Sequence, residues 1–317
     1  RYTVMPESPP AVLRALQAFV TSRAELQQGQ SQATGFLTLP AVVRDFYFAA
    51  IQFLRLAAEE GKHSFVDLSK QDSAAERRPT LCIRNVIPAH FIGARFDAAH
   101  CAVLFSATLG PKSFNMNVLG LPSQTTSIDV DSPFDGDQLK IQVVTSVSTR
   151  YAHRDRSVRK LIDAMRSQYE QRPGNYLAFF SSFDYLRSVY EQFRHAAPQI
   201  PAFAQQPRMS ERDREAFVKR LRVSRGGIAF AVLGGGFAEG IDLPGDQLVG
   251  AFIATLGLPQ INAVNEAMRQ CLENAFNCGY EYTYLYPGIQ KVAQAAGRII
   301  RASTDEGTLM LIDDRYG

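Results

Sequence analysis

Three polar side chains near the C-terminus recur at steps that would bring them together on a helix. They belong to QAAGRIIR, residues 294–301, in which Gln294, Arg298 and Arg301 are four and three residues apart. These steps place side chains on one helical face, and Gly297 would let a neighbouring backbone approach closely. Two guanidinium groups on one face can neutralise a transferring phosphoryl group, an effect on the order of 10³ to 10⁵ in rate for one arginine. A solvated basic face is the commoner reason for an arginine pair, but this order and spacing favours phosphate binding.

A glycine-rich segment, residues 234–259, follows an apolar run and contains Glu239, Gly240 and Asp242. Glycine after a strand can form a phosphate cradle, but the Lys-Ser/Thr ending of a P-loop is absent here. The segment is therefore not a P-loop. Taken alone, three successive glycines after a strand more often form a tight turn.

Small hydroxyl residues follow two other apolar runs. In VLFSATLGP, residues 103–111, Thr108 lies where a strand would end, and it could hydrogen-bond to either of two neighbouring domains. In GNYLAFFSSFDY, Ser181 and Ser182 stand between an expected strand and an expected helix. Backbone amides and hydroxyls at a helix start can hold a DNA phosphate, although an N-cap serine would explain the pair as well.

Basic residues gather in TSVSTRYAHRDRSVRK, residues 145–160, around Tyr151. Cations beside an aromatic ring can follow a single-stranded backbone and stack a base, so Arg150 and Arg154 are candidate DNA contacts. The alternative is a solvated basic face. The net charge is only +3, so any nucleic-acid binding must come from such a local groove.

Alternating strand and helix patterns are expected to position these residues. Several strands are apolar without alternation, as in sheets covered by helices on both faces. The expected strands are residues 80–86, 101–106, 140–146, 175–180, 227–233, 248–255 and 307–313, and the expected helices are 157–171, 182–194, 210–223, 260–274 and 289–301. Residues 1–60 have helical periodicity and 62–79 are polar, which favours a loop or junction. The pattern predicts an α/β fold with a doubly wound, mainly parallel sheet after an N-terminal helical segment.

Together these segments resemble motifs III to VI of the DinG and XPD branch of superfamily 2 DNA helicases. SAT at 106–108 resembles motif III, Ser181 and Ser182 motif IV, the glycine-rich segment motif V, and QAAGRIIR motif VI, with LIDDRYG at 311–317 as its continuation. The resemblance implies that Arg298 and Arg301 sense the γ-phosphate with Gln294 as their neighbour. It also implies that Glu239, Gly240, Asp242 and Gly297 lie at the nucleotide, and that Ser181, Ser182, Arg150, Arg154 and Thr108 lie on the DNA side.

The resemblance also divides the chain into domains. Residues 1–79 would end an arch domain, 80–119 would hold the last strands of a first RecA-like domain, and 120–317 would form the second RecA-like domain. Members of this family use ATP and Mg²⁺ to move 5′ to 3′ along single-stranded DNA, and many carry an iron–sulfur cluster in the first motor domain.

The chain departs from the family in lacking both a GxxxxGK[ST] sequence and a DEAH-type acidic box. Since it also opens with Arg1, we expect the C-terminal part of a longer helicase, inactive alone and dependent on the first RecA-like domain for ATP and Mg²⁺. Its four cysteines lack metal-site spacing, so any cluster would belong to the preceding part. Two alternatives remain: a non-catalytic relative that binds DNA or a partner, and an unrelated α/β nucleotide-binding enzyme.

The composition is that of a globular protein without a membrane span. Hydrophobic residues make up 46% and charged residues 21% of 317, so most of the chain should fold. No apolar run approaches the roughly 20 residues that a spanning helix needs. We therefore expect a cytoplasmic protein.

Overall fold

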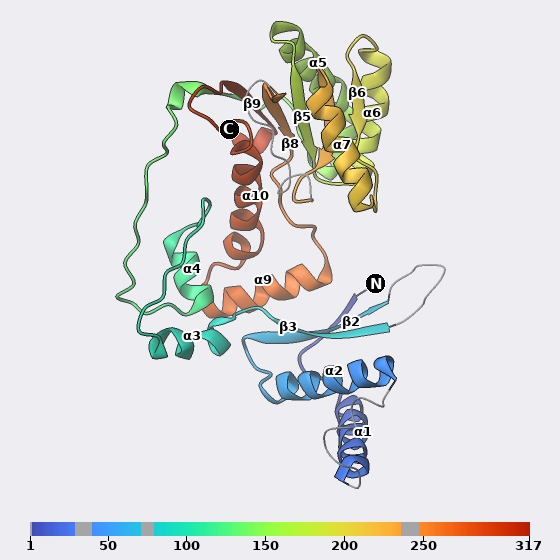
Figure 1. The fold of residues 1–317 in the computed structure, drawn as a ribbon, viewed down its shortest axis with the longest axis vertical. Coiled ribbons are helices and arrows are strands. Elements are labelled where there is room, and N and C mark those ends of the chain that lie inside the picture. Colours follow the sequence, from blue (N-terminus) through green and yellow to red (C-terminus); the bar gives the residue numbers. More distant parts are fainter. Residues whose placement is uncertain (1, 29–39, 71–78, 236–246) are drawn as a thin grey trace. The chain divides into compact units, whose positions relative to one another are not determined.

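The structure is a computed structural model that describes residues 2–28, 40–70, 79–235 and 247–317 (Figure 1). Two compact units form, each from separate stretches of chain. Unit 1 comprises Arg1–Leu104, Pro111–Thr125 and Gln260–Thr283, and unit 2 comprises Phe105–Gly110, Thr126–Pro259 and Tyr284–Gly317. The domain boundaries at 79 and 119 stay predictions, while Gln260–Thr283, expected within the second domain, groups with unit 1.

Unit 2 is built on a six-stranded parallel sheet. Its strands are β4 (Leu139–Val144), β5 (Asn175–Phe180), β6 (Ala202–Ala204), β7 (Gly227–Val232), β8 (Gly250–Ala254) and β9 (Gly307–Ile312), in the order β4-β9-β8-β5-β7-β6. Every adjacent pair is parallel. The prediction of a doubly wound, RecA-like α/β fold is confirmed, and β6 is the one strand of this sheet that the sequence analysis missed.

Helices cover both faces of this sheet, which explains its uninterrupted apolar strands. Helices α5 (Arg154–Gln171) and α6 (Phe183–Ala196) pack on the face that includes Phe180, Phe230 and Phe252. Helices α7 (Glu211–Val223) and α10 (Tyr286–Ala296) contribute to the opposite core, which includes Leu177 and Phe179. All six residues of β5 are buried, and each buried large apolar side chain stabilises the fold by about 1.5–3 kcal/mol. The sheet is thus a rigid support for whatever its strand ends carry.

Unit 1 combines helices with a three-stranded antiparallel sheet. Its strands are β1 (Tyr2–Met5), β2 (Ser64–Lys70) and β3 (Pro79–Asn85), in that order, and its helices are α1 (Pro10–Gln28), α2 (Ala41–Ala58), α3 (Ala89–Ala98), α4 (Lys112–Leu119) and α9 (Ala263–Phe276). Helices α1 and α2 confirm the helical expectation for most of the first 60 residues that the structure describes.

Three sequence-based expectations about the first 106 residues are wrong. Residues 1–60 were expected to be helical, but Tyr2–Met5 form β1, which pairs with β2. Residues 62–79 were expected to be a loop, but β2 lies there, because Phe65 and Val66 are buried and the equally buried Asp67 pairs with Arg84 on β3 at 2.5 Å. Residues 101–106 were expected to be a strand, yet no strand in the described parts of the chain pairs with them, and Phe105 is 90% exposed. An apolar segment becomes a β-strand only when its backbone hydrogen-bonds to a neighbouring strand, and this segment has no such neighbour among the described residues.

Candidate phosphate-binding edges of the parallel sheet

The motif VI arginines lie in a loop at the amino ends of the strands, which corrects the sequence prediction. Helix α10 ends at Ala296, and Arg298 and Arg301 follow it in turn and coil, so they do not share a helical face with Gln294. The chain leaves the helix because Ile299 and Ile300 are buried in the core beside the first residues of β9.

The glycines of this loop act differently from the prediction. Gly297 caps α10 with an ordinary φ of −65°, and a Cβ there would meet only the Ala293 and Gln294 carbonyl oxygens of the preceding turn, at 3.4 and 3.8 Å. Close approach occurs at Gly307 instead, where a Cβ would lie 2.0 Å from Cγ2 of Ile299. Gly307 therefore allows the loop to pack against the start of β9.

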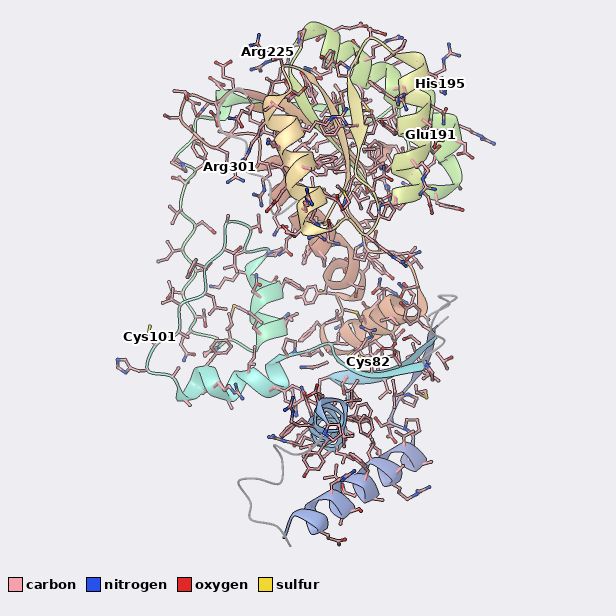
Figure 2. All side chains as sticks on the ribbon, turned by 45° about the vertical axis from the view of Figure 1, so that its right-hand side comes forward. Cys82, Cys101, Glu191, His195, Arg225 and Arg301 are labelled. Atoms are coloured by element: carbon pink, nitrogen blue, oxygen red, sulfur yellow. The ribbon has the colours of Figure 1, made fainter. Side chains whose placement is uncertain are left out.

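The backbone of the arginine loop is fixed by two polar side chains. The backbone N–H groups of Arg301 and Ala302 both donate to Oδ2 of the buried Asp305, each at 2.8 Å. Nε2 of Gln138 lies 2.7–3.2 Å from the carbonyl oxygens of Ala302, Ser303 and Asp305. Arg301 lies at the margin of unit 2 (Figure 2). Its side chain is exposed, whereas Arg298 is half-buried. The loop thus has a defined backbone from which guanidinium groups can reach an anion.

A second polar cluster, at the carboxyl ends of the strands, centres on Asp313 after β9. Asp313 is fully buried and accepts hydrogen bonds from the backbone and hydroxyl of Thr149 and from Arg315, whose Nε and Nη2 lie 2.6 and 3.0 Å away. Burial opposes the charged carboxylate, but the hydrogen bonds from Arg315 and Thr149 outweigh it and hold the pKa of Asp313 well below its ordinary value. The buried charge is therefore compensated, and it ties β9 to the segment after β4.

Arg154 extends this cluster to the end of β5. Its Nε donates to the Thr149 carbonyl at 3.0 Å, its Nη2 donates to Oγ of Ser181 at 2.7 Å, and its guanidinium lies 4.6 Å from the Tyr185 ring centroid. Burial raises the pKa of Tyr185 to about 12, partly offset by Arg154. The structure thus brings together Arg154 and Ser181, two of the predicted DNA contacts, and orients a cation beside a hydroxyl.

The neighbouring predicted DNA contacts have more ordinary partners. Ser182 is the N-cap of α6, where its side chain accepts from the backbone of Tyr185 at 3.3 Å, so the N-cap alternative is correct for that residue. Arg150 is exposed and forms an ion pair with Asp314 at 3.4 Å. Their DNA roles stay predictions.

Thr108 belongs to the short stretch of unit 2 that rests on α10. Nε2 of Gln290, on that helix, lies 3.4 Å from the Thr108 carbonyl oxygen, and a Cβ on Gly110 would lie 2.6 Å from the same Nε2. Because α10 leads into the arginine loop, the motif III segment and motif VI share one rigid support.

The remaining motif V residues, Glu239, Gly240 and Asp242, lie outside the described residues. Gly234, just before them, has φ +78°, a conformation that favours glycine and supports a tight turn after β7. Within the described ranges, no group of three or more His, Cys, Asp or Glu side chains is arranged to hold a metal ion. None of the described helices is both long and apolar enough to cross a bilayer.

The two clusters occupy opposite ends of the same strands. At about 3.3 Å per residue, the six residues of β9 separate the arginine loop from Asp313 by roughly 20 Å. Gln138, Thr149 and Tyr185 were not singled out from the sequence, because their roles depend on partners far away in the chain. Their one sequence signal is position, since Gln138 directly precedes β4, Thr149 follows β4, and Tyr185 lies in the first turn of α6.

Comparison with known proteins identifies the same region. The family model described as "Helicase C-terminal domain" matches residues 165–317. A probable ATP-dependent helicase of Methanocaldococcus jannaschii is 28% identical over 236 residues, covering 68% of this chain and 34% of the relative. The Bacillus subtilis protein named 3′-5′ exonuclease DinG is 23% identical over 284 residues, covering 85% of this chain and 29% of the relative.

Solved structures give the same fold. An XPD structure without ligand matches with a TM-score of 0.64 and 18% identity, covering 100% of this chain and 61% of the other. Another XPD helicase structure matches with a TM-score of 0.62 at 18% identity, covering 100% of this chain and 54% of the other. The chain spans 24–34% of the length of three curated helicase relatives. The family match favours the helicase interpretation over an unrelated α/β enzyme, and the resemblance to the C-terminal region of DinG- and XPD-like superfamily 2 helicases, which motifs III to VI predicted, is confirmed.

Proposed function

We propose that this chain is the C-terminal motor region of a longer ATP-dependent DNA helicase, which couples ATP hydrolysis to movement along single-stranded DNA and to duplex unwinding. A 5′ to 3′ direction of movement and a cytoplasmic location are part of the proposal, the former implied by the family resemblance. In this proposal the two ends of the parallel sheet carry different tasks. The amino-end loop acts on the nucleotide, and the carboxyl-end cluster acts on the DNA.

The fixed backbone of the arginine loop is the observation that carries this proposal. Asp305 and Gln138 hold the loop through its amides and carbonyls, so the backbone that carries Arg301 is fixed. A guanidinium on a pre-formed backbone loses less entropy when it meets a phosphate, and arginine matches phosphate oxygens in a bidentate manner. Arg298 and Arg301 would therefore stabilise charge on the γ-phosphoryl group that ATP supplies, with Gln294 and Gly297 on the adjoining turn.

The carboxyl-end cluster is suited to a DNA phosphate. Arg154 is held by Thr149 and by the ring of Tyr185, and the Ser181 hydroxyl that it contacts stands at the start of α6. A phosphate oxygen there would meet a pre-oriented cation and a hydroxyl at a helix N-terminus. Tyr151, which is exposed within 5.6 Å of the Arg154 guanidinium, could stack a base beside that phosphate.

The nucleotide site requires a partner domain in this proposal. The chain has no Walker A sequence, so ATP and Mg²⁺ would be held mainly by a first RecA-like domain of the same longer protein, with any iron–sulfur cluster also there. Arg298 and Arg301 would complete that site, with Glu239, Gly240 and Asp242 coupling it to DNA. The isolated chain should then not turn over ATP, and turnover by the purified chain that Arg298→Ala abolishes would contradict this.

The test uses the intact helicase that contains this chain. Arg301→Ala should reduce DNA-stimulated ATP turnover by about 10³-fold or more, with little change in affinity for single-stranded DNA. Arg225→Ala removes an equal charge from the turn before β7 and is the matched control, which should retain full turnover. Equal loss of turnover and DNA affinity in Arg301→Ala would overturn the assignment, as would wild-type turnover.

A further inference from the structure

A cavity at the outer end of the parallel sheet is separate from both clusters. It has a volume of about 400 Å³ and lies where β6 ends and α7 begins, within unit 2. This volume is near the lower end of the roughly 300–1,000 Å³ typical of small-ligand sites. Its lining is mainly apolar with arginines, and comprises Phe203, Ala204, Gln206, Pro207, Arg208, Met209, Asp213, Ala216, Phe217 and Arg220.

The floor of the cavity is a fixed aromatic surface. Phe203 and Phe217 are buried and pack edge to face with ring centroids 4.9 Å apart. The Arg220 guanidinium lies 4.4 Å from the Phe203 ring centroid and is itself exposed. A guanidinium supported by an aromatic ring presents a flat cationic surface, on which a nucleobase can stack.

The other wall contains a backbone outlier. Arg208 has φ +57°, in the left-handed region that residues other than glycine, asparagine and aspartate rarely adopt. The turn is held by the Gln206 N–H, which lies 3.4 Å from Sδ of Met209. Such strain costs of order 1 kcal/mol and tends to be retained where it places a functional side chain. Here it places a second exposed arginine at the rim.

The charges around the cavity select an anionic ligand. Arg208 and Arg220 are both exposed, and among the lining residues that the structure describes Asp213 is the one acid. Asp213 is engaged by Ser210 in the N-terminal cap of α7, through contacts of 2.7 and 3.2 Å, and those hydrogen bonds lower its pKa. The two arginines are therefore available for a phosphate, while Met209 and Ala204 offer an apolar contact.

The cavity lies at the same end of the strands as Arg154 and Ser181. It follows the carboxyl end of β6, and β6 is separated from β5 by β7 alone. At about 4.8 Å per strand spacing, the two sites are roughly 10 Å apart across the sheet. A short stretch of extended single strand can cover that distance.

We propose that this cavity is a nucleotide subsite, which holds one base and its phosphate of the same single strand that contacts Arg154. The inference rests on the proposed DNA-binding function and extends it to the outer edge of the sheet. The base stacks against Arg220 over Phe203, and the phosphate pairs with Arg208.

The test measures binding of fluorescein-labelled oligothymidylates of about 4 to about 16 nucleotides to the full chain by anisotropy. Arg220→Gln should weaken binding of the longer oligomers roughly 5- to 10-fold and leave the shortest unchanged, because only longer strands reach the cavity. Arg194→Gln is the matched control. Arg194 also lies over an aromatic ring, that of Tyr190, but it is in the last turn of α6, at the other end of the helix from Ser181. It should bind every length as the wild type does.

A second variant separates binding from folding. Arg208→Gly removes the rim cation and places glycine where φ is positive, so it should fold at least as stably as the wild type and still weaken binding of the longer oligomers. A 5-iododeoxyuridine within a bound oligomer should photocrosslink to the peptide that contains Met209.

The outcomes distinguish failure of the subsite from failure of the DNA-binding proposal. Equal affinities for wild type, Arg220→Gln and Arg208→Gly at every length would overturn the subsite and leave the DNA-binding proposal standing. Absence of binding of any oligomer by the wild type would overturn both. An acidic peptide that binds the wild type but not Arg220→Gln, with DNA binding unchanged, would reassign the cavity to a protein partner.

Discussion

Arginines lie at both ends of the parallel sheet in unit 2, but their side chains are held in different ways. At the amino ends, Arg301 is exposed and extends from a loop whose backbone is held by Asp305 and Gln138. At the carboxyl ends, Arg315 and Arg154 contribute to the structure, through a buried carboxylate and through carbonyl and hydroxyl acceptors. The comparison teaches that a guanidinium can be oriented in two ways: by a fixed backbone beneath it, as at Arg301, or by direct contacts to the guanidinium itself, as at Arg154.

Asp313 should give the largest effect on stability at the carboxyl ends. Asp313→Ala leaves Arg315 and Thr149 without their buried acceptor and should lower the free energy of unfolding by about 3–5 kcal/mol, as for other broken buried pairs. The measurement is urea unfolding of the chain.

Its neighbour supplies the control. Asp314 is 37% exposed and forms two long ion pairs, with the exposed Arg150 at 3.4 Å and with Arg315 at 3.9 Å, so Asp314→Ala should cost less than about 1 kcal/mol. Similar losses in the two variants would mean that the buried network does not hold the carboxyl ends together.

At the amino ends, Gln138→Ala should change activity more than stability. Losing the contacts to the carbonyl oxygens of Ala302, Ser303 and Asp305 would loosen the arginine loop and lower ATP turnover of the intact helicase by about tenfold. Gln142→Ala, on the same strand β4, is the control and should leave turnover unchanged. Wild-type ATP turnover in Gln138→Ala would contradict the role of Gln138 in holding the arginine loop.

The carboxyl-end network should also respond to acid. The folded-state pKa of Asp313 is depressed, so its carboxylate stabilises the fold at neutral pH, and this contribution is lost as pH falls below about 4, the ordinary value for aspartate. The difference in unfolding free energy between wild type and Asp313→Asn should therefore shrink between about pH 5 and about pH 3. A difference that stays constant over that range would contradict the cited pKa direction.

The salt dependence of single-stranded DNA binding should show the smallest effect, and it distinguishes an arginine that contacts a phosphate from one that does not. If Arg154 contacts a DNA phosphate, Arg154→Gln should reduce the slope of log affinity against log salt by about 0.7 for single-stranded DNA. Arg159→Gln, an exposed cation on the same helix, should leave the slope unchanged. Equal slopes in all three proteins would place the DNA elsewhere.

Local patterns predicted unit 2 because its strands carry their signal in their own residues. β5, β7, β8 and β9 are continuous apolar runs, and the helical pattern of residues 210–223 predicted α7. β6 was missed, since three residues carry too little pattern, and β2 was missed because its Asp67 and Ser69 look like a loop until β3 pairs with it.

The site could be predicted in composition but not in geometry. The spacing of Gln294, Arg298 and Arg301 identified the motif, yet it placed them on a helix that ends at Ala296. The reason is tertiary: Ile299 and Ile300 gain more by entering the core than by extending the helix. Gln138 and Asp305 are 167 residues apart in the chain, so no local pattern could have joined them.

The most direct test of separate tasks is a double-mutant comparison in the intact helicase. Wild type, Arg301→Ala, Arg154→Ala and the double variant are compared for ATP turnover at saturating DNA and for affinity for single-stranded DNA. Arg301→Ala should lose turnover and keep affinity, Arg154→Ala should lose affinity and keep turnover at saturation, and the two effects should add because roughly 20 Å separates the sites. Loss of both properties in each single variant would contradict the account.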